Sequence, residues 1–518
     1  MWRGEKFLFS KNLCAAFFWL DHSPFNLPFP SMASLTTTTR LSRAHQCLQW
    51  CSDRRKDIPA SSSKESSQFT FLESVTPFDH GVFDWGIGLK AARDLSNGEQ
   101  LCSLPTRWAW SSRVAVTDPI LGPLLRKLPI FRRDDLIAIK LTFHKSLGED
   151  SPWYGHTQAL PEMYDSVLFW TKEELEELQG TSTYQLANAL QQQVAQDYEE
   201  LRQLMWPAVG NAEEEEEVDE EVEDKSKEED CVVSSEFFTM ESYMWALGTL
   251  WSRGHDFVRG TGQMEQFRCM LPGIDLLNMA SSGKNANVEV RLVSNRVDLV
   301  VISSSGIKQG EELRVVYNQN LPNNRLLHLH GFVVSPNPLS HVELHCELSP
   351  QAPLYKEKIK LLANIGETTP HKLTLENPIP KTLLYTLALQ RASTEAELQS
   401  LVEANSARRS GGSGGDGQMD GNEVLLLREL ILALTQMLGN YRTTEEVDEE
   451  ILEEQKNESE EIAATVSVSK RRLRLAVRLR YDEKQILRKS LSTLMMLLSA
   501  GDDDSSSSED DEEDDVDD

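Results

Sequence analysis

The sequence predicts an α+β protein in which two groups of short strands flank a helical segment and a further helical domain follows. The glycine-containing stretch 81–104 indicates the first group of strands, and three short apolar runs within 288–317 indicate the second. Apolar residues recur at helical spacing between these groups, and again from residue 355 almost to the end. The chain has 518 residues, which is enough for two or three domains.

The N-terminal part predicts a small β region. A helix is expected at 46–53, and a Ser/Lys linker follows at 61–67. The strand-like stretch Gly81–Ala92 then leads to Asn97-Gly98, which is a hairpin-type turn signal, and to a second strand at Gln100–Leu104.

The central part predicts helices. Leu136, Ile139, Phe143 and Leu147 lie on one helical face, which Gly148 ends. A capping box at 171–174 opens further helical sequence that continues to about Met205.

An apolar helix is then expected at 236–253, with Gly254 as its stop. Strands are expected at Val288–Leu292, Val297–Ile302 and Leu313–Tyr317.

The net charge of −30 is very unevenly distributed. Residues 213–230 carry 13 acidic and 2 basic side chains, and residues 502–518 carry 12 acidic and no basic ones. Both runs lack the apolar residues that offset chain entropy, so we expect a solvated loop and a disordered tail. They could attract basic partners, although solubilising low-complexity sequence is the favoured interpretation. The rest of the chain has an ordinary charge.

The seven cysteines include no CxxC pair, which argues against a structural zinc site and a disulfide framework and suits a reducing compartment. No apolar run approaches the roughly 20 residues of a membrane span. The first 20 residues make a poor signal peptide, whereas residues 32–40 are rich in Ser and Thr and free of acids. We expect a cytoplasmic or nuclear protein, with a plastid as the alternative.

Four segments carry candidate chemistry, and each also has a purely structural interpretation. Trp85-Gly-Ile-Gly88 allows close backbone approach to a ligand, or it is a bulged strand. Arg253 holds a carboxylate, or it is a charge at a helix C-terminus. Asp275 and Asn278 interrupt an apolar run, either for a ligand or as a buried turn bonded to nearby backbone. Tyr317 closes an apolar strand, which is often only amphipathic core.

Taken together, the order and spacing of these segments resemble the SET-domain methyltransferases, in the branch of Rubisco large-subunit methyltransferase. The likeness spans roughly residues 46–338 and is weaker over 474–494. The motifs that carry it are Gly86-Ile-Gly88-Leu-Lys-Ala91, Asp94-Leu-Ser-Asn-Gly98-Glu99, Ser151-Pro-Trp153, Leu160-Pro161, Ser252-Arg253, Asp275-Leu-Leu-Asn278-Met279, Gly310-Glu-Glu-Leu-Arg-Val-Val-Tyr317, Asn323, Leu326-Leu327, His330-Gly-Phe332 and, at the C-terminus, Arg478, Tyr481, Glu483 and Lys484.

The resemblance implies methyl transfer from S-adenosylmethionine to a lysine of a protein substrate. It implies Tyr317 as the catalytic tyrosine, with His330 where the family has a tyrosine that shapes the lysine channel. Met279 stands in place of the family's usual histidine, and His255 stands where an aromatic residue often follows Ser-Arg. The cofactor-binding residues that it implies are Trp85, Gly86, Ile87, Gly88, Arg253, Asp275, Asn278, Met279 and Phe332.

Two alternatives stay open because of these departures. One is methylation of another side-chain nitrogen, such as histidine, which is mostly neutral at pH 7. The other is a non-enzymatic binding module that keeps the fold. We expect a monomer with a protein partner, no metal, no direct nucleic-acid binding and no membrane association.

The expected domain organisation has four parts. An N-terminal extension (1–43) precedes a SET domain (44–338), a helical substrate-binding domain (339–500) and an acidic tail (501–518). The SET domain holds a helical insert at about 130–253, which contains the acidic loop 212–230, and the substrate-binding domain contains a flexible loop at 408–421.

Overall fold

The structure is a computed structural model. It describes residues 36–53, 71–80, 86–128, 132–206, 233–259, 265–280, 285–316, 321–364, 370–409, 421–456 and 467–503. The predicted linker 61–67 and acidic loop 212–230 lie outside these residues, as do most of the predicted N-terminal extension, the loop 408–421 and the acidic tail.

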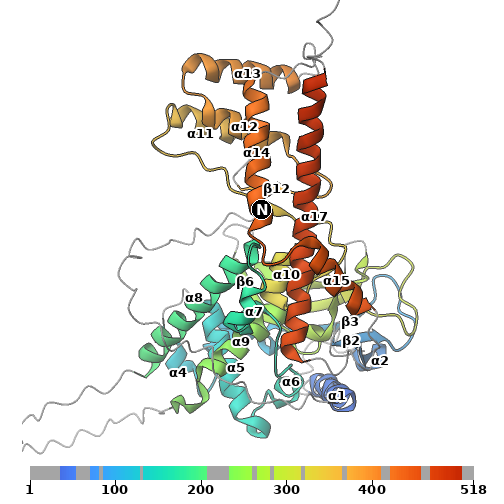
Figure 1. Cartoon of the computed structure of the whole chain (residues 1–518). Helices are drawn as coiled ribbons and strands as arrows, with labels where there is room; N and C mark the ends of the chain where they lie inside the picture. The colour runs from blue at the N-terminus through green and yellow to red at the C-terminus, as the bar shows by residue number, and fades with distance from the viewer. Residues whose placement is uncertain are drawn as a thin grey trace, which may run out of the picture.

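The body of the molecule (Figure 1) combines small sheets with helices of very different lengths. Its helices are α1 (Thr37–Asp53), α2 (Phe71–Ser74), α3 (Ser112–Ala115), α4 (Gly122–Leu125), α5 (Arg133–Ser146), α6 (Tyr154–Thr157), α7 (Lys172–Glu176), α8 (Ser182–Met205), α9 (Met240–Arg253) and α10 (Asn323–His330). Several predictions are confirmed here. α5 covers the predicted apolar face, α9 ends at Arg253 as predicted from Gly254, and the capping box of Thr171 and Glu174 opens α7.

The strands of the body form four small sheets. They are β1 (Val75–Asp79), β2 (Ile87–Ala91), β3 (Gln100–Pro105), β4 (Trp110–Ser111), β5 (Gly254–Arg259), β6 (Glu265–Met270), β7 (Asn278–Met279), β8 (Val288–Val293), β9 (Arg296–Val301) and β10 (Arg314–Val315). The sheet orders are β1-β2, β3-β9-β8, β4-β6-β5 and β10-β7, and only the last pair is parallel.

One predicted pairing is wrong. The turn signal at Asn97-Gly98 predicted that the strands on either side of it form a hairpin, but β2 pairs with β1 and β3 pairs with β9. Gly98 does turn the chain, with φ of 78°, yet its amide bonds the carbonyl of Val301 rather than closing a hairpin. The Asn-Gly dipeptide therefore predicted a turn correctly, but each of the two neighbouring strands pairs with a different strand.

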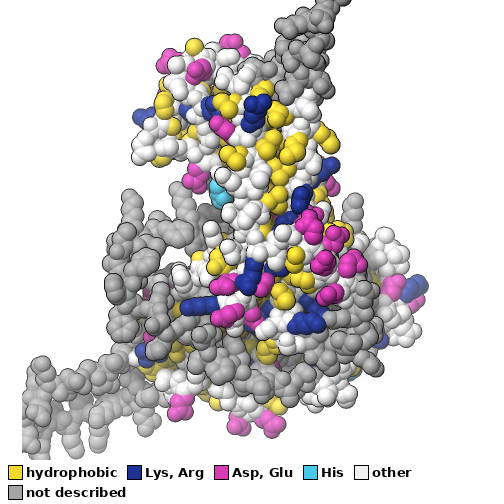
Figure 2. All heavy atoms as spheres, in the orientation of Figure 1, with side chains coloured by type: hydrophobic (Ala, Val, Ile, Leu, Met, Phe, Trp, Pro, Cys, Tyr) yellow, Lys and Arg dark blue, Asp and Glu magenta, His cyan; other side chains and the backbone are white. Residues whose placement is uncertain are grey.

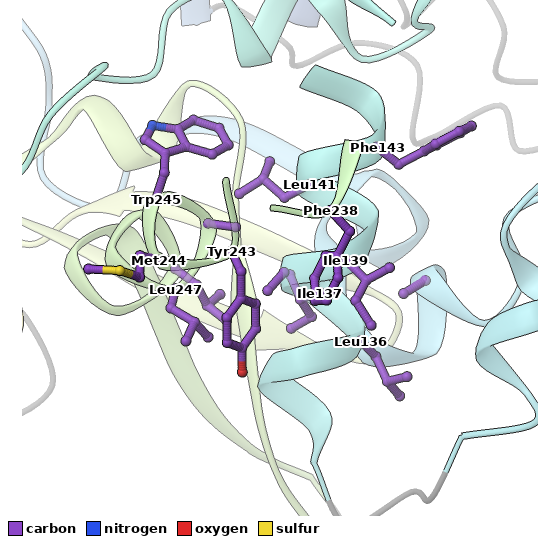
Figure 3. Close-up of a cluster of buried hydrophobic side chains, with 14 of the residues drawn as sticks. Leu136, Ile137, Ile139, Leu141, Phe143, Phe238, Tyr243, Met244, Trp245 and Leu247 are labelled. Carbon is purple, nitrogen blue, oxygen red and sulfur yellow. The ribbon is translucent and has the colours of Figure 1, made fainter. Parts of the chain in front are cut away.

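Two apolar cores support these elements. One lies among the sheets and includes Leu89, Leu101 and Leu299. The other lies in the helical insert, where α5 and α9 pack together with Phe238 between them and the aromatic ring of Tyr243 inside (Figure 3). Tyr243 donates its hydroxyl hydrogen to Asp135 at 2.7 Å, which satisfies the polar end of a buried side chain.

The C-terminal part is dominated by one long helix, α17 (Val468–Asp503), which runs beside α14 away from the body (Figure 1). Its other elements are α11 (Tyr355–Asn364), α12 (Lys381–Arg391), α13 (Glu395–Arg409), α14 (Gly421–Gly439), α15 (Glu445–Lys456) and the strands β11 (Val342–Leu344) and β12 (His371–Leu373). The two strands pair in antiparallel fashion, so this part contains a small sheet that the sequence did not reveal.

Buried ion pairs join α17 to the rest of the molecule. Arg472 contacts Glu174 of the insert at 2.6 Å, and Arg480 contacts Asp448 of α15 at 2.8 Å and Glu177 at 2.8 Å. Figure 2 shows acidic and basic side chains interspersed around this junction. Because Arg480 and Asp448 are almost fully buried, removing either partner would leave an uncompensated charge in the interior. The contacts therefore fix the start of α17 against the body.

Candidate cofactor site

Strands β2 and β7 approach each other so closely that any side chain at Gly88 would press against its neighbours. A Cβ atom on Gly88 would lie 2.6 Å from Nδ2 of Asn278, 3.0 Å from Oε1 of Glu312 and 3.0 Å from the ring of Phe78. Gly86 differs, because its φ of 65° is the left-handed region and a Cβ there would meet no described atom within 4 Å. The motif thus combines one glycine needed for packing with one needed for backbone conformation.

Glu312 holds this crossing together. Its carboxylate accepts hydrogen bonds from His80 Nε2 at 2.8 Å, from Asn278 Nδ2 at 3.0 Å and from Arg314 Nε at 2.7 Å. Burial alone raises the pKa of Glu312, but these hydrogen bonds outweigh it, and the pKa lies below its usual value. The negative charge therefore stays in place at neutral pH and fixes the amide of Asn278.

Asp275 lies in the short 3₁₀ turn Ile274–Leu276 and is connected to the helical insert. Its Oδ2 contacts Nε2 of His156 at 2.8 Å, and Nδ1 of His156 accepts a hydrogen bond from Nε1 of Trp110 at 2.8 Å. Because Trp110 can only donate, Nε2 of His156 carries the hydrogen that Asp275 accepts. Burial raises the pKa of Asp275, but His156 and Arg253 outweigh this effect and hold it below its usual value.

Arg253 reaches the same turn from the end of α9. Its Nη1 donates to the backbone carbonyl of Asp275 at 2.8 Å. The chain then passes directly from α9 into β5, because Gly254 is extended with φ of −77°. The guanidinium is thus held by the turn that precedes Asn278, which favours a role at the site over a simple helix-end charge.

Met279 follows Asn278 and takes part in strand pairing through its backbone. It lies in β7 opposite Val315 of β10, and the next amide, of Ala280, donates to the carbonyl of Val315 at 2.9 Å. Its side chain is buried with 7 % exposure. A methionine fits this apolar environment, so replacing the family's histidine leaves the strand pairing intact.

His330 and Phe332 lie at the C-terminal end of α10, separated by Gly331 in the left-handed conformation with φ of 76°. Nδ1 of His330 lies 3.2 Å from the carbonyl of Ser252, to which it donates, and the rings of His330 and Phe332 are 5.9 Å apart. Burial lowers the pKa of His330 to about 4. The imidazole is therefore neutral at physiological pH.

The structure brings several of the predicted site residues into contact. Gly88 and Asn278 are in contact across the β2 and β7 crossing, Arg253 and Asp275 are in contact at the following turn, and His330 reaches this region through Ser252. Gly86 and Ile87 stand at the start of β2. Trp85 and Tyr317 lie outside the described residues, so their roles stay predictions.

Sequence reasoning missed Glu312 and His156. Glu312 stands inside the Gly-Glu-Glu motif, which was a signal, but nothing in the sequence indicated that its carboxylate binds Asn278, 34 residues earlier. His156 is 119 residues from Asp275 and carried no signal. The suggestion that Asp275 and Asn278 serve a local turn through nearby backbone is wrong for these contacts, because their side-chain partners belong to distant segments.

Comparison with known proteins agrees with this architecture. Residues 349–487 match the family model described as Rubisco LSMT substrate-binding. The chloroplastic Rubisco large-subunit N-methyltransferase of Nicotiana tabacum is 26 % identical over 436 residues, which cover 81 % of this chain and 78 % of the relative. The crystal structure of the SET domain of LSMT bound to lysine and AdoHcy superposes with a TM-score of 0.63 at 21 % identity, covering 89 % of this chain and 93 % of that one.

Over most of its length the chain is similar to Rubisco LSMT-like SET-domain proteins, and its residues 349–487 match their substrate-binding region. Other relatives in this range differ in their named targets. The chloroplastic fructose-bisphosphate aldolase-lysine N-methyltransferase of Arabidopsis thaliana is 26 % identical and covers 78 % of this chain and 76 % of the relative. Actin-histidine N-methyltransferase of Mus musculus is 24 % identical and covers 79 % of this chain and 64 % of the relative.

The predicted resemblance to Rubisco large-subunit methyltransferase and the predicted α+β fold class are thus confirmed. Among the described residues no helix has both the length and the hydropathy of a membrane span, and no cluster of His, Cys, Asp or Glu could hold a metal ion.

Proposed function

We propose that this Rubisco LSMT-like protein transfers methyl groups from S-adenosylmethionine to a lysine side chain of a protein substrate. The observation that carries the proposal is the crossing of β2 and β7 at Gly88, where Glu312 fixes Asn278 beside the turn that holds Arg253. The names of the relatives from Nicotiana tabacum and Arabidopsis thaliana, both protein-lysine or Rubisco N-methyltransferases, support the same reaction.

The residues at this crossing fit the polar groups of S-adenosylmethionine. The cofactor carries an ammonium, a carboxylate and an adenosine. Because Nδ2 of Asn278 donates to Glu312, its Oδ1 is the atom suited to accept from an ammonium. The guanidinium of Arg253 suits a carboxylate, and Oδ1 of Asp275 is a buried acceptor without a partner among the described residues. Gly86 adds a backbone position without a Cβ, beside which no described atom lies within 4 Å.

Methyl transfer needs a neutral, aligned nitrogen. The cofactor supplies an activated methyl group, so the protein contributes mostly alignment of the target nitrogen and removal of its proton. With a lysine pKa near 10.4, deprotonation at pH 7 costs roughly 4.6 kcal/mol, and a desolvated channel lowers this cost. His330 suits such a channel because it is neutral and places no positive charge near the amine. Tyr317 is proposed as the catalytic tyrosine from its place in the motif.

A radiolabelled methyl-transfer assay on whole-cell extract tests this proposal. We expect at least one labelled protein band with the wild-type enzyme and its loss with Tyr317→Phe, which removes only the hydroxyl. Calorimetry with S-adenosylmethionine should show binding in both proteins and much weaker binding for Asn278→Ala. An absence of any labelled band that depends on Tyr317 would refute the enzymatic function, and cofactor binding by the same sample would then indicate a binding module.

Histidine methylation is the second candidate. The likeness to actin-histidine N-methyltransferase and the presence of His330 in place of a tyrosine favour it. Complete hydrolysis of the labelled product distinguishes the two: methyl-lysine supports the first proposal, and methyl-histidine supports the second.

The compartment, the oligomeric state and the domain limits belong to this proposal as well. The chloroplastic relatives support a plastid location over the cytoplasm or nucleus. Import into isolated chloroplasts tests the location. Light scattering of the purified chain tests the expected monomer. Limited proteolysis tests the expected boundary near residue 338.

A further inference from the structure

The side chain of Asn323, the first residue of α10, ties the segment that enters this helix to the segment that leaves it. Its Nδ2 donates to the carbonyl of Val334 at 2.8 Å, and its Oδ1 accepts from the amide of Val334 at 3.0 Å. Oδ1 also accepts from Nδ2 of Asn337 at 3.0 Å, and Asn337 in turn donates to the carbonyl of Leu321 at 2.9 Å. The segment that enters α10 and the segment that leaves it are thus fixed to one amide.

The remaining hydrogen bond of this amide is donated to the C-terminal helix. Nδ2 of Asn323 donates to Oδ2 of Asp482 on α17 at 2.9 Å, across 159 residues of sequence. Asn323 is 1 % exposed, so its four hydrogen bonds use the full capacity of a buried amide. Loss of Asp482 would leave one of its N–H groups unpaired in the interior, which is costlier than losing a solvated contact.

Packing around this bond joins the same two helices. Leu327 on the second turn of α10 lies in one apolar cluster with Ala476 and Leu479 of α17. Arg478 of α17 also reaches Oγ of Ser335 at 3.5 Å, in the segment that leaves α10. Asp482 is therefore the polar member of a joint between α17 and α10.

The joint lies next to residues of the candidate site. α10 ends at His330, whose Nδ1 contacts the carbonyl of Ser252 beside Arg253, and Phe332 lies two residues before Val334. A shift of Asn323 would move Val334 through two hydrogen bonds and thereby the backbone that carries Phe332. Because methyl transfer depends on alignment, such a shift matters more for the rate than for binding.

We propose that Asp482 is a positioning residue for methyl transfer: through Asn323 it holds α10 and the segment carrying His330 and Phe332 in place, so that the C-terminal helix forms part of the working site. The proposal rests on the proposed methyltransferase function. Asp482 lies within the matched region 349–487, and the proposal gives this part of α17 a second role. That role does not need a bound protein substrate, because the contact joins α17 to α10.

The test compares Asp482→Ala with Asp482→Asn and with Arg488→Ala. Asn keeps an oxygen that accepts from Asn323, and Arg488 is a matched control on α17 whose contacts go to Glu445 of α15 instead of α10. Hydrogen–deuterium exchange of residues 321–337 is measured on each full-length protein. kcat and KM are measured with S-adenosylmethionine and the labelled acceptor protein.

With Asp482→Ala we expect amide exchange in 321–337 about tenfold faster and kcat about tenfold lower, with KM for the acceptor within about twofold. Asp482→Asn should restore both, and Arg488→Ala should change neither. The proposal is overturned if Asp482→Ala has the same amide exchange and the same kcat as the wild type. It is also overturned if kcat falls equally in Asp482→Ala and Asp482→Asn. If no variant, wild type included, methylates protein, the proposed function fails, while the exchange data still decide whether Asp482 holds α10.

Discussion

Replacing Gly88 by alanine tests the closest approach in the candidate site. The added Cβ would lie 2.6 Å from Nδ2 of Asn278 and 3.0 Å from Oε1 of Glu312. Ordinary contact begins near 3.4 Å, so Asn278 must move by about 0.8 Å or the strands must separate. Gly88 does not have a positive φ, so the cost is steric rather than conformational.

Overpacking of this kind lowers the free energy of unfolding by about 1–3 kcal/mol. Movement of Asn278 also weakens its hydrogen bond to the Glu312 carboxylate, and a bond to a charged group contributes about 1.5–3 kcal/mol. If Asn278 binds the cofactor, losing about 1.4 kcal/mol of that interaction raises the Kd for S-adenosylmethionine about tenfold. We therefore expect Gly88→Ala to be folded, moderately destabilised and impaired in cofactor binding.

Gly98→Ala is the matched control. Gly98 has φ of 78° and no described atom within 4 Å of an added Cβ, so alanine there costs about 1–2 kcal/mol of backbone strain without touching the site. Denaturant unfolding and calorimetry on both variants separate the two effects. The reasoning is refuted if Gly88→Ala binds S-adenosylmethionine with wild-type affinity, or if Gly98→Ala weakens binding equally.

Two further predictions concern pH. Burial raises the pKa of Glu483 to about 8, so the folded protein keeps a proton that the unfolded chain releases above about pH 4.5. Its contribution to the free energy of unfolding is therefore present at low pH and is lost as the pH rises through 8. At about 1.36 kcal/mol per pKa unit the loss is a few kcal/mol. Glu483→Gln should reduce this fall in the free energy of unfolding between pH 5 and 9, measured by denaturant unfolding. For a lysine acceptor, kcat/KM should rise about tenfold per pH unit between 7 and 9, because the acceptor amine loses its proton over this range while His330 stays neutral. A profile that is already level above pH 7.5 would instead fit a histidine acceptor.

The sequence predicted elements whose signals are local. The apolar face of α5, the capping box of α7 and the stop of α9 before Gly254 each depend on residues within one or two turns, and each is confirmed. The pairing of the strands could not be predicted in this way. β3 pairs with β9, where Ser103 faces Asp298 across 195 residues, and no local turn signal carries that information.

The same distinction holds for the site. Gly88, Asn278 and Arg253 could be proposed because the family motifs name them. Glu312 and His156 act through partners far away in sequence, and Asp482 contacts Asn323 of α10, which lies 159 residues earlier. A buried carboxylate with a histidine or amide partner is a contact that only the folded structure brings together.

Asp275 shows why loss of function alone would not prove cofactor contact. Its carboxylate accepts the hydrogen bond of the neutral His156 whether or not a ligand is present, and losing a buried hydrogen bond to a charged group costs about 1.5–3 kcal/mol. Asp275→Asn would thus reduce activity under either interpretation. His156 shares the bond but is not predicted to touch the cofactor, so His156→Gln should lose stability by a similar amount while changing the Kd for S-adenosylmethionine much less. The double variant then isolates their coupling. Equal losses of cofactor affinity in both single variants, with no further loss in the double, would mean that Asp275 shapes the turn for Asn278 and Arg253 and does not itself bind the ligand.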